Sequence, residues 1–303
     1  MVDRRKYVNY NTANRLRLDF LEPLRKYDCH FIVGNHDCHF RSSNRINSMS
    51  ELIEGKYNNI KVYVDPIEVE FDGVSVLMIP WINNENRKAT FDLIGSTRAQ
   101  IAMGHLELMG FEMYRGSIMT HGDDPKLFSK FDVVLSGHYH HKSDNGRVFY
   151  LGSHAEFTWS DFEDDKGFHV FDTDTRELTF IKNPFGMFTK VWYNDTDTTL
   201  TSIVQGDYSM YSNKIVKVIV TEKSNPHWFD IFTGKIEAAG AIDVNIVDDH
   251  LNLNLEDDND IVNEAESTLD IFKKYISGND LGVDRAPLES LINSLYSEAT
   301  TIQ

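Results

Sequence analysis

The chain has 303 residues, of which 41% are apolar and 25% charged, and its net charge is −17. This length suits one large domain with a smaller one, and no apolar stretch is long enough to cross a bilayer. Phosphate contacts normally depend on Lys and Arg, so an acidic chain is a poor DNA binder unless metal ions or a partner supply positive charge.

The N-terminus and the cysteines bear on cellular location. No apolar segment follows residues Met1 to Lys6, which is not typical of a secretory signal. Cys29 and Cys38 are too few for a disulfide framework. We therefore expect a cytoplasmic protein without membrane association.

The first part of the chain alternates helical and strand patterns. Apolar residues repeat at helical spacing from Asn11 to Lys26, and Asn11 or Thr12 is expected to cap that helix. Asp72-Gly73 predicts a hairpin turn. Further helices are expected at residues 48–54, 87–97 and 124–131, and strands at 31–33, 60–64, 67–71, 74–79, 101–103 and 132–135.

Hairpin signals follow. Asn145-Gly146 precedes a strand at residues 148–151, and a turn joins strands at 168–171 and 178–181. The mixture of βα units and hairpins predicts an α/β domain of two packed sheets with helices outside.

The pattern changes after residue 183. A strand at 215–220, a helix at 228–239 and a strand at 242–247 predict a compact β-α-β unit. An acidic segment then precedes two helices with apolar stripes, at residues 261–276 and 285–299.

Three apolar strands end in a glycine that is followed by side chains able to bind metal. Because ligands gather at the carboxyl ends of strands in open α/β sheets, these side chains should share one edge. They are Asn35, His36, His105, His138 and His140.

Imidazole nitrogen and amide oxygen suit Mn, Zn or Fe, and two ions roughly 3.5–4 Å apart can clamp a phosphodiester. We expect Asn35, His105 and His138 to bind one ion and His140 the other. His36 is placed to donate a proton to the leaving alkoxide.

Each residue also has a structural interpretation. A single histidine after a strand is more often a hydrogen-bonded structural residue, and Asn-His-Asp in a loop is often only turn chemistry. Three glycine-preceded positions after three strands favour the metal site. The remaining histidines are expected to be structural (His121, His154, His169, His227 and His250) or to lie at the rim (His39 and His141).

The motifs Gly-Asn-His-Asp, Gly-His and Gly-His-Tyr-His, in this order, resemble those of calcineurin-like metallophosphoesterases. The similarity is strongest to SbcD-type recombination nucleases and their tailed-phage counterparts. The similarity extends to residues 62–81, 104–110 and 167–175 and to the sequence Leu-Tyr-Ser-Glu-Ala-Thr at residues 295–300. It therefore covers essentially the whole chain.

The resemblance implies a four-layer α/β/β/α sandwich at residues 1–183, a small α+β cap that faces DNA at 184–250, and an acidic linker with C-terminal helices at 251–303. It implies DNA as substrate, an SbcC-like SMC-type ATPase that receives those helices, and a homodimer within a heterotetramer. The helices could instead pack on their own domain. The location would be the cytoplasm, or the host cytoplasm if a phage encodes the chain.

The resemblance also implies roles in the site. Asn35, His105, His138 and His140 would be ligands of two divalent ions, expected to be Mn, and His36 would be the catalytic histidine.

The start of the chain departs from the family. Its members begin with Asp-x-His on one strand and Gly-Asp-x-x-Asp on the next, whereas here the first motif is absent and residues 1–5 resemble the tail of the second. Asp3 would then orient His36. Without a bridging aspartate, the repulsion between two cations is poorly offset. We expect an N-terminally truncated nuclease with an exposed sheet edge, weak metal binding and little activity.

Three functions compete. The preferred one is the metal-dependent DNA exo/endonuclease subunit of an SbcCD-type recombination and repair complex, which hydrolyses phosphodiester bonds. The second is a catalytically impaired fragment that docks the ATPase. The third is another metallophosphoesterase, such as a phosphatase, which would have no need of the two C-terminal regions.

Overall fold

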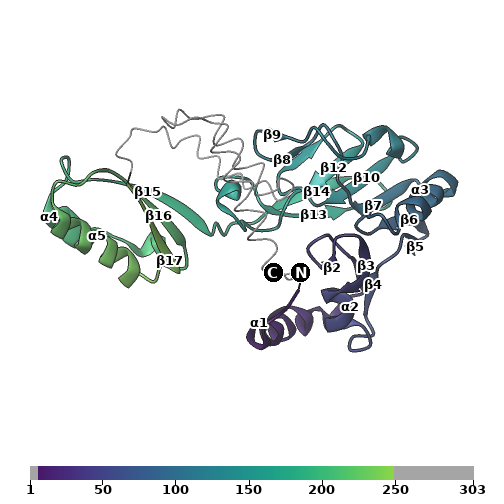
Figure 1. Cartoon of the computed structure of the whole chain (residues 1–303), viewed down its shortest axis with the longest axis horizontal. Helices are drawn as coiled ribbons and strands as arrows, with labels where there is room; N and C mark the ends of the chain where they lie inside the picture. The colour runs from purple at the N-terminus through teal and green to yellow at the C-terminus, as the bar shows by residue number, and fades with distance from the viewer. Residues whose placement is uncertain (1–5, 249–303) are drawn as a thin grey trace, which may run out of the picture. The chain divides into compact units, whose positions relative to one another are not determined.

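The computed structural model describes residues 6–248, whose centre is a six-stranded sheet in the order β11-β12-β10-β7-β6-β5 (Figure 1). Strands β6, β7, β10 and β12 run parallel, and β5 and β11 are antiparallel edge strands. The predicted α/β class is therefore confirmed. The strands are β5 Ile67–Phe71, β6 Val74–Ile79, β7 Ile101–His105, β10 Val133–Gly137, β11 Lys142–Asp144 and β12 Val148–Leu151.

A second β layer packs against one face of this sheet. It contains the parallel pair β1 Cys29–Ile32 and β4 Ile60–Tyr63, and the hairpin β13 Gly167–Phe171 with β14 Leu178–Lys182. Side chains from both pieces, Ile32, Tyr63 and Phe171, contact the buried Val76, Met78 and Ile101 of β6 and β7. Two layers of strands are expected when buried apolar runs such as β7 need cover on both faces.

The helix at the start of the described chain begins earlier than predicted. The side chain of Asn9 accepts a hydrogen bond from the Thr12 amide, so Asn9 is the N-cap and the prediction of Asn11 or Thr12 was wrong. Asn9 has the extended backbone that an N-cap needs. The helical segment consists of α1 Tyr10–Arg15, the π-helix Leu16–Leu21 and the 3₁₀ turn Pro23–Lys26.

Other local predictions were confirmed with small shifts. Helices α2 Ser48–Ile53 and α3 Arg87–Ser96 lie where expected. Asp72 and Gly73 have φ of +49° and +80°, as a hairpin turn with two left-handed residues requires. Strands not predicted include β2 Cys38–Phe40, β3 Ser43–Asn47, β8 Glu112–Tyr114 and β9 Ser117–Ile118.

The helix predicted at residues 124–131 was wrong. The structure has one 3₁₀ turn, Pro125–Phe128, which Asp124 caps. Phe128 and Phe131 are both buried, and Ser129 ends the turn so that the chain can enter β10. Phe128 and Phe131 therefore fill the core from a short turn and the residues directly after it, without a longer helix.

Within residues 188–248, the parallel strands β15, β16 and β17 form a further sheet with α4 and α5 on one face (Figure 1). The predicted β16-α5-β17 unit was confirmed, whereas β15 and α4 were not predicted. The core contains Val216, Val218, Phe229 and Ile236. The elements are β15 Phe188–Asn194, α4 Leu200–Gln205, β16 Ile215–Glu222, α5 Pro226–Ala238 and β17 Asp243–Asp248.

Several predictions concern residues outside the described part. The helices expected at 261–276 and 285–299 lie there, and the division at residues 183 and 250 stays a prediction. The longest described helix, α5, has 13 residues, and none of the described helices could cross a bilayer.

Asn44 joins segments that are distant in sequence. Its side-chain oxygen accepts hydrogen bonds from Cys38 at 3.2 Å and Asn83 at 2.9 Å. Its side-chain nitrogen donates to the carbonyls of Val64 at 3.1 Å and Trp81 at 2.8 Å, just after β4 and β6. Asn44 therefore fixes the loop after β1 against the ends of these strands.

We predict that Asn44→Ala lowers the free energy of unfolding by about 2–4 kcal/mol, because it leaves buried partners without their hydrogen bonds. Urea unfolding followed by circular dichroism measures this. Asn58→Ala, at an exposed position in the turn before β4, should change it by less than about 0.5 kcal/mol. Equal effects of the two substitutions would contradict the role of Asn44.

Candidate metal site

The loop after β1 brings its backbone against β7. Asp37 is buried and accepts a hydrogen bond from the Gly34 amide at 3.0 Å, while its own amide donates to the Gly34 carbonyl. A Cβ added to Gly34 would lie 2.9 Å from His105 Cε1. Glycine is therefore needed here for the close approach of the His105 ring, which explains why the motif begins with it.

Asn35, His105 and His138 come together from three strand ends, as the sequence predicted. Asn35 Oδ1 lies 3.0 Å from His105 Nε2, and the ring centroids of His105 and His138 are 4.9 Å apart. His138 has φ of +86°, which re-aims the chain directly after β10. Trp81 borders both rings, at 6.0 Å from His105 and 5.3 Å from His138. The carboxamide of Asn35 and the imidazoles of His105 and His138 therefore lie close together.

The environment keeps His105 neutral. Burial above all, together with the nearby charges of His36 and His140, lowers its pKa from 6.5 to about 3. A neutral imidazole has a lone pair for a metal ion. The charges of His36 and His140 act on His105, so both residues lie within electrostatic range of that ring.

His140 is oriented by a buried carboxylate. Its Nδ1 lies 3.2 Å from both oxygens of Asp161, whose side chain is inaccessible to solvent. Asp161 also pairs with Lys166 at 2.8 Å. Burial alone would raise the pKa of Asp161, but the hydrogen bond and charge of His140, with those of Lys166, hold it well below its usual range. With Nδ1 occupied, Nε2 is the nitrogen left to bind a ligand.

Four residues of the site were not predicted from the sequence: Asp161, Lys166, Asp37 and Trp81. Asp161 lies in Trp159-Ser160-Asp161-Phe162, a stretch in which no regular element was expected. The sequence feature that could have indicated Asp161 is its capping box with Thr158, around the 3₁₀ turn Trp159–Asp161. This feature is easily missed because so short a turn has no clear periodicity of apolar residues.

One predicted residue cannot be placed. Asp3 lies outside the described residues, and its predicted role beside His36 stays a prediction. Among residues 6–248, no three His, Cys, Asp or Glu side chains are grouped to hold a metal ion. The group described above has an amide as its third donor.

The donor set nevertheless fits one divalent ion. Two imidazoles and a carboxamide oxygen converge, and one of the imidazoles is kept neutral by its surroundings. These are borderline-to-hard donors of the kind that Mn, Zn and Fe accept.

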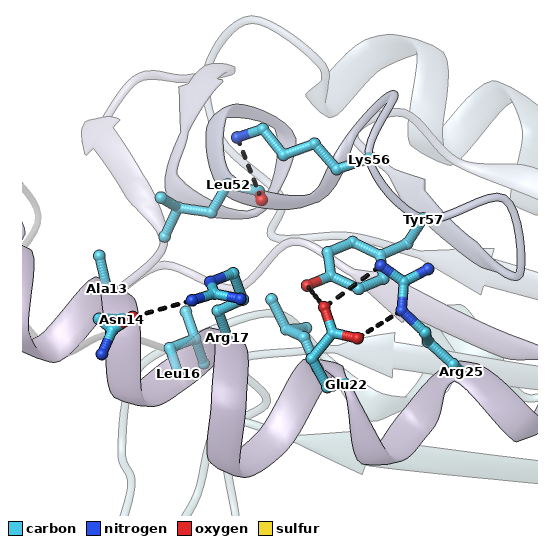
Figure 2. A pocket seen from close by; sticks show the side chains of 10 residues that line it. Ala13, Asn14, Leu16, Arg17, Glu22, Arg25, Leu52, Lys56 and Tyr57 are labelled. Carbon is cyan, nitrogen blue, oxygen red and sulfur yellow. Dashed lines mark hydrogen bonds and ion pairs between the residues drawn. The ribbon is translucent and has the colours of Figure 1, made fainter.

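A hollow of about 470 Å³ lies elsewhere, between the N-terminal helical segment and α2 (Figure 2). Its charged side chains are engaged with neighbouring side chains or with the backbone. Glu22 accepts hydrogen bonds from Arg25 and Tyr57, and Lys56 donates to the Leu52 carbonyl. The hollow holds none of the residues of the metal site.

Comparisons with known proteins agree with this geometry. Residues 2–142 match the family described as calcineurin-like phosphoesterase. The chain is 34% identical over 274 residues to "Exonuclease subunit 1" of Enterobacteria phage T4, covering 89% of this chain and 77% of that protein. It is 23% identical over 235 residues to the D subunit of the nuclease SbcCD of Staphylococcus epidermidis, covering 66% of this chain and 58% of that protein.

The fold and the site define a calcineurin-like phosphoesterase, and the chain belongs to that family. Within the family it belongs with the SbcD-type nuclease subunits. The predicted family and enzyme class are confirmed.

The lowered pKa of His105 predicts a pH dependence of stability. The unfolded chain takes up a proton near pH 6.5, whereas folded His105 does so only near pH 3. The contribution of His105 is therefore complete above about pH 6.5 and is lost as the pH falls toward 3, by at most about 1.4 kcal/mol per pH unit. Urea unfolding between about pH 7.5 and 4.5 should show a shallower loss in His105→Asn. Parallel curves for the two proteins would contradict this.

The position of Asp161 predicts an effect on metal affinity. Asp161→Asn should weaken Mn²⁺ binding about 10- to 100-fold, because His140 loses the carboxylate that orients it. Isothermal titration calorimetry measures this. Asp165→Asn is the matched control, since Asp165 is exposed and pairs with Lys182 at the surface. An unchanged affinity in Asp161→Asn would contradict the role of Asp161.

Proposed function

We propose that this chain is the metal-dependent nuclease subunit of a two-protein complex that processes DNA in recombination and repair. The observation that carries the proposal is the convergence of Asn35, His105 and His138 at the ends of three strands. The names of the two relatives, an exonuclease subunit and a nuclease subunit, support DNA as the substrate.

In this proposal Asn35, His105 and His138 hold one Mn²⁺ ion and His140 serves a second. When bound, the ions would polarise the phosphodiester and activate water as the nucleophile. Asp161 keeps the His140 ring in place through Nδ1. His36, which adjoins Asn35 and lies within electrostatic range of His105, donates a proton to the leaving alkoxide.

The charge of the chain supports a partner. With a net charge of −17, the chain offers little positive surface for the DNA backbone. We infer that an SMC-type ATPase supplies it and docks on residues 251–303, in a heterotetramer with two copies of each chain. Both relatives are named as subunits, which is consistent with such an assembly. The complex would work in the cytoplasm.

We predict that His36→Ala reduces Mn²⁺-dependent cleavage of linear duplex DNA about 10²- to 10⁴-fold, the range for loss of a general acid. Gel analysis of end-labelled DNA measures the rate. Because His36 is not a proposed ligand, calorimetry should show Mn²⁺ affinity close to that of the unaltered chain.

The control is His39→Ala, whose ring packs on the exposed Phe40, and it should cleave normally. Metal binding without any cleavage by the unaltered chain would favour a docking module for the ATPase. Cleavage of small phosphate monoesters but not of DNA would favour another metallophosphoesterase.

A further inference from the structure

An exposed phenylalanine stands beside the proposed metal site. The ring of Phe157 is 5.9 Å from that of His140 and 5.2 Å from that of His154, both between ring centroids. Phe157 is 52% exposed, so about half of its surface is left open next to a candidate metal ligand.

The backbone that carries Phe157 is held firmly on both sides. The amides of Phe157 and Thr158 donate to Asp161 Oδ2 at 2.9 Å and 3.0 Å. This is the carboxylate that also binds His140 Nδ1. The backbone of Phe157 and the ring of His140 are therefore held by the same buried carboxylate.

The preceding residue fixes the other side. Glu156 is buried and accepts hydrogen bonds from the amides of Met187, at 2.5 Å, and Phe188, at 2.8 Å. Residues 156–161 thus have carboxylate anchors at both ends. An exposed aromatic ring on a fixed backbone loses little conformational freedom when a ligand binds it, as a recognition residue should.

We propose that Phe157 stacks on an unpaired nucleobase of the DNA strand whose phosphate lies at the metal site. The proposal rests on the proposed function, and it adds the part of the substrate that this side of the site recognises. Every base has a π-face, so a phenyl ring can bind any base without a charge of its own. This suits an acidic chain, which gains little from phosphate contacts. The enzyme would accordingly favour single-stranded over fully paired ends.

The test compares two oligonucleotides of equal length and charge. One is single-stranded oligo(dT) and the other has an abasic analogue at every position, so only the bases differ. Fluorescence anisotropy without Mn²⁺ gives Kd in the absence of cleavage. Phe157→Leu should weaken oligo(dT) binding about 5- to 20-fold and leave abasic binding unchanged. Phe157→Trp should bind oligo(dT) as well as the unaltered chain or better.

Phe168→Leu is the matched control, because Phe168 is 59% exposed on β13 and the change in side chain is the same. It should leave binding of both oligonucleotides unchanged. Equal losses on oligo(dT) and the abasic strand in Phe157→Leu would show a general distortion and overturn the proposal. If Phe157→Leu binds both oligonucleotides as tightly as the unaltered chain, the stacking proposal is also overturned. That result is expected if Phe157 instead contacts a protein partner.

The outcome for the proposed function is separate. If the unaltered chain binds oligo(dT) and cleaves DNA but Phe157→Leu behaves identically, only the stacking inference fails. If the unaltered chain neither binds nor cleaves DNA under any condition, the proposed function fails and the inference with it.

Discussion

The site depends on the parallel register of β7 and β10. Gly104 pairs with Ser136 and His105 with Gly137, so both strands end at the same level of the sheet. The loop after β1 joins this edge because the Trp81 amide donates to the Val33 carbonyl at 2.8 Å. A slip of one residue in the register of β7 against β10 would turn an imidazole to the opposite face of the sheet. The metal-binding donors would then no longer meet.

The electrostatics of the site separate into two zones. Around His105, burial lowers the pKa of the ring and keeps it uncharged. Around His140 a full negative charge on Asp161 is balanced by the buried Lys166, which also donates to the His140 carbonyl at 2.8 Å. Pairing offsets the desolvation of these two charges, so the carboxylate can remain ionised without contact with water.

Much of the fold could be predicted because its signals are local. The apolar runs of β6, β7 and β10 and the Asp72-Gly73 turn each carry their own pattern, and the glycine-histidine endings marked the residues that meet. The prediction failed where contacts distant in sequence decide the conformation. The 3₁₀ turn Pro125–Phe128 was predicted as a helix because Pro125 suits the first turn of a helix, but the chain leaves the turn at Ser129 to enter β10.

The same reason explains the groups that were missed in the site. Asp161 was missed because its partner His140 is 21 residues away, and no spacing within its own segment shows that pairing. Strand β15 was missed because half-buried and exposed residues interrupt its alternation, and its place is fixed by pairing with β16.

The carboxylates of Glu156 and Asp161 have a mechanical consequence. One holds the start of β15, through the amides of Met187 and Phe188, and the other holds the ring of His140. Between them lies a short segment with little slack. A force that displaces β15 would therefore be transmitted along it as tension and would tilt the imidazole, so strain on a remote sheet can become a change in the geometry of a metal ligand.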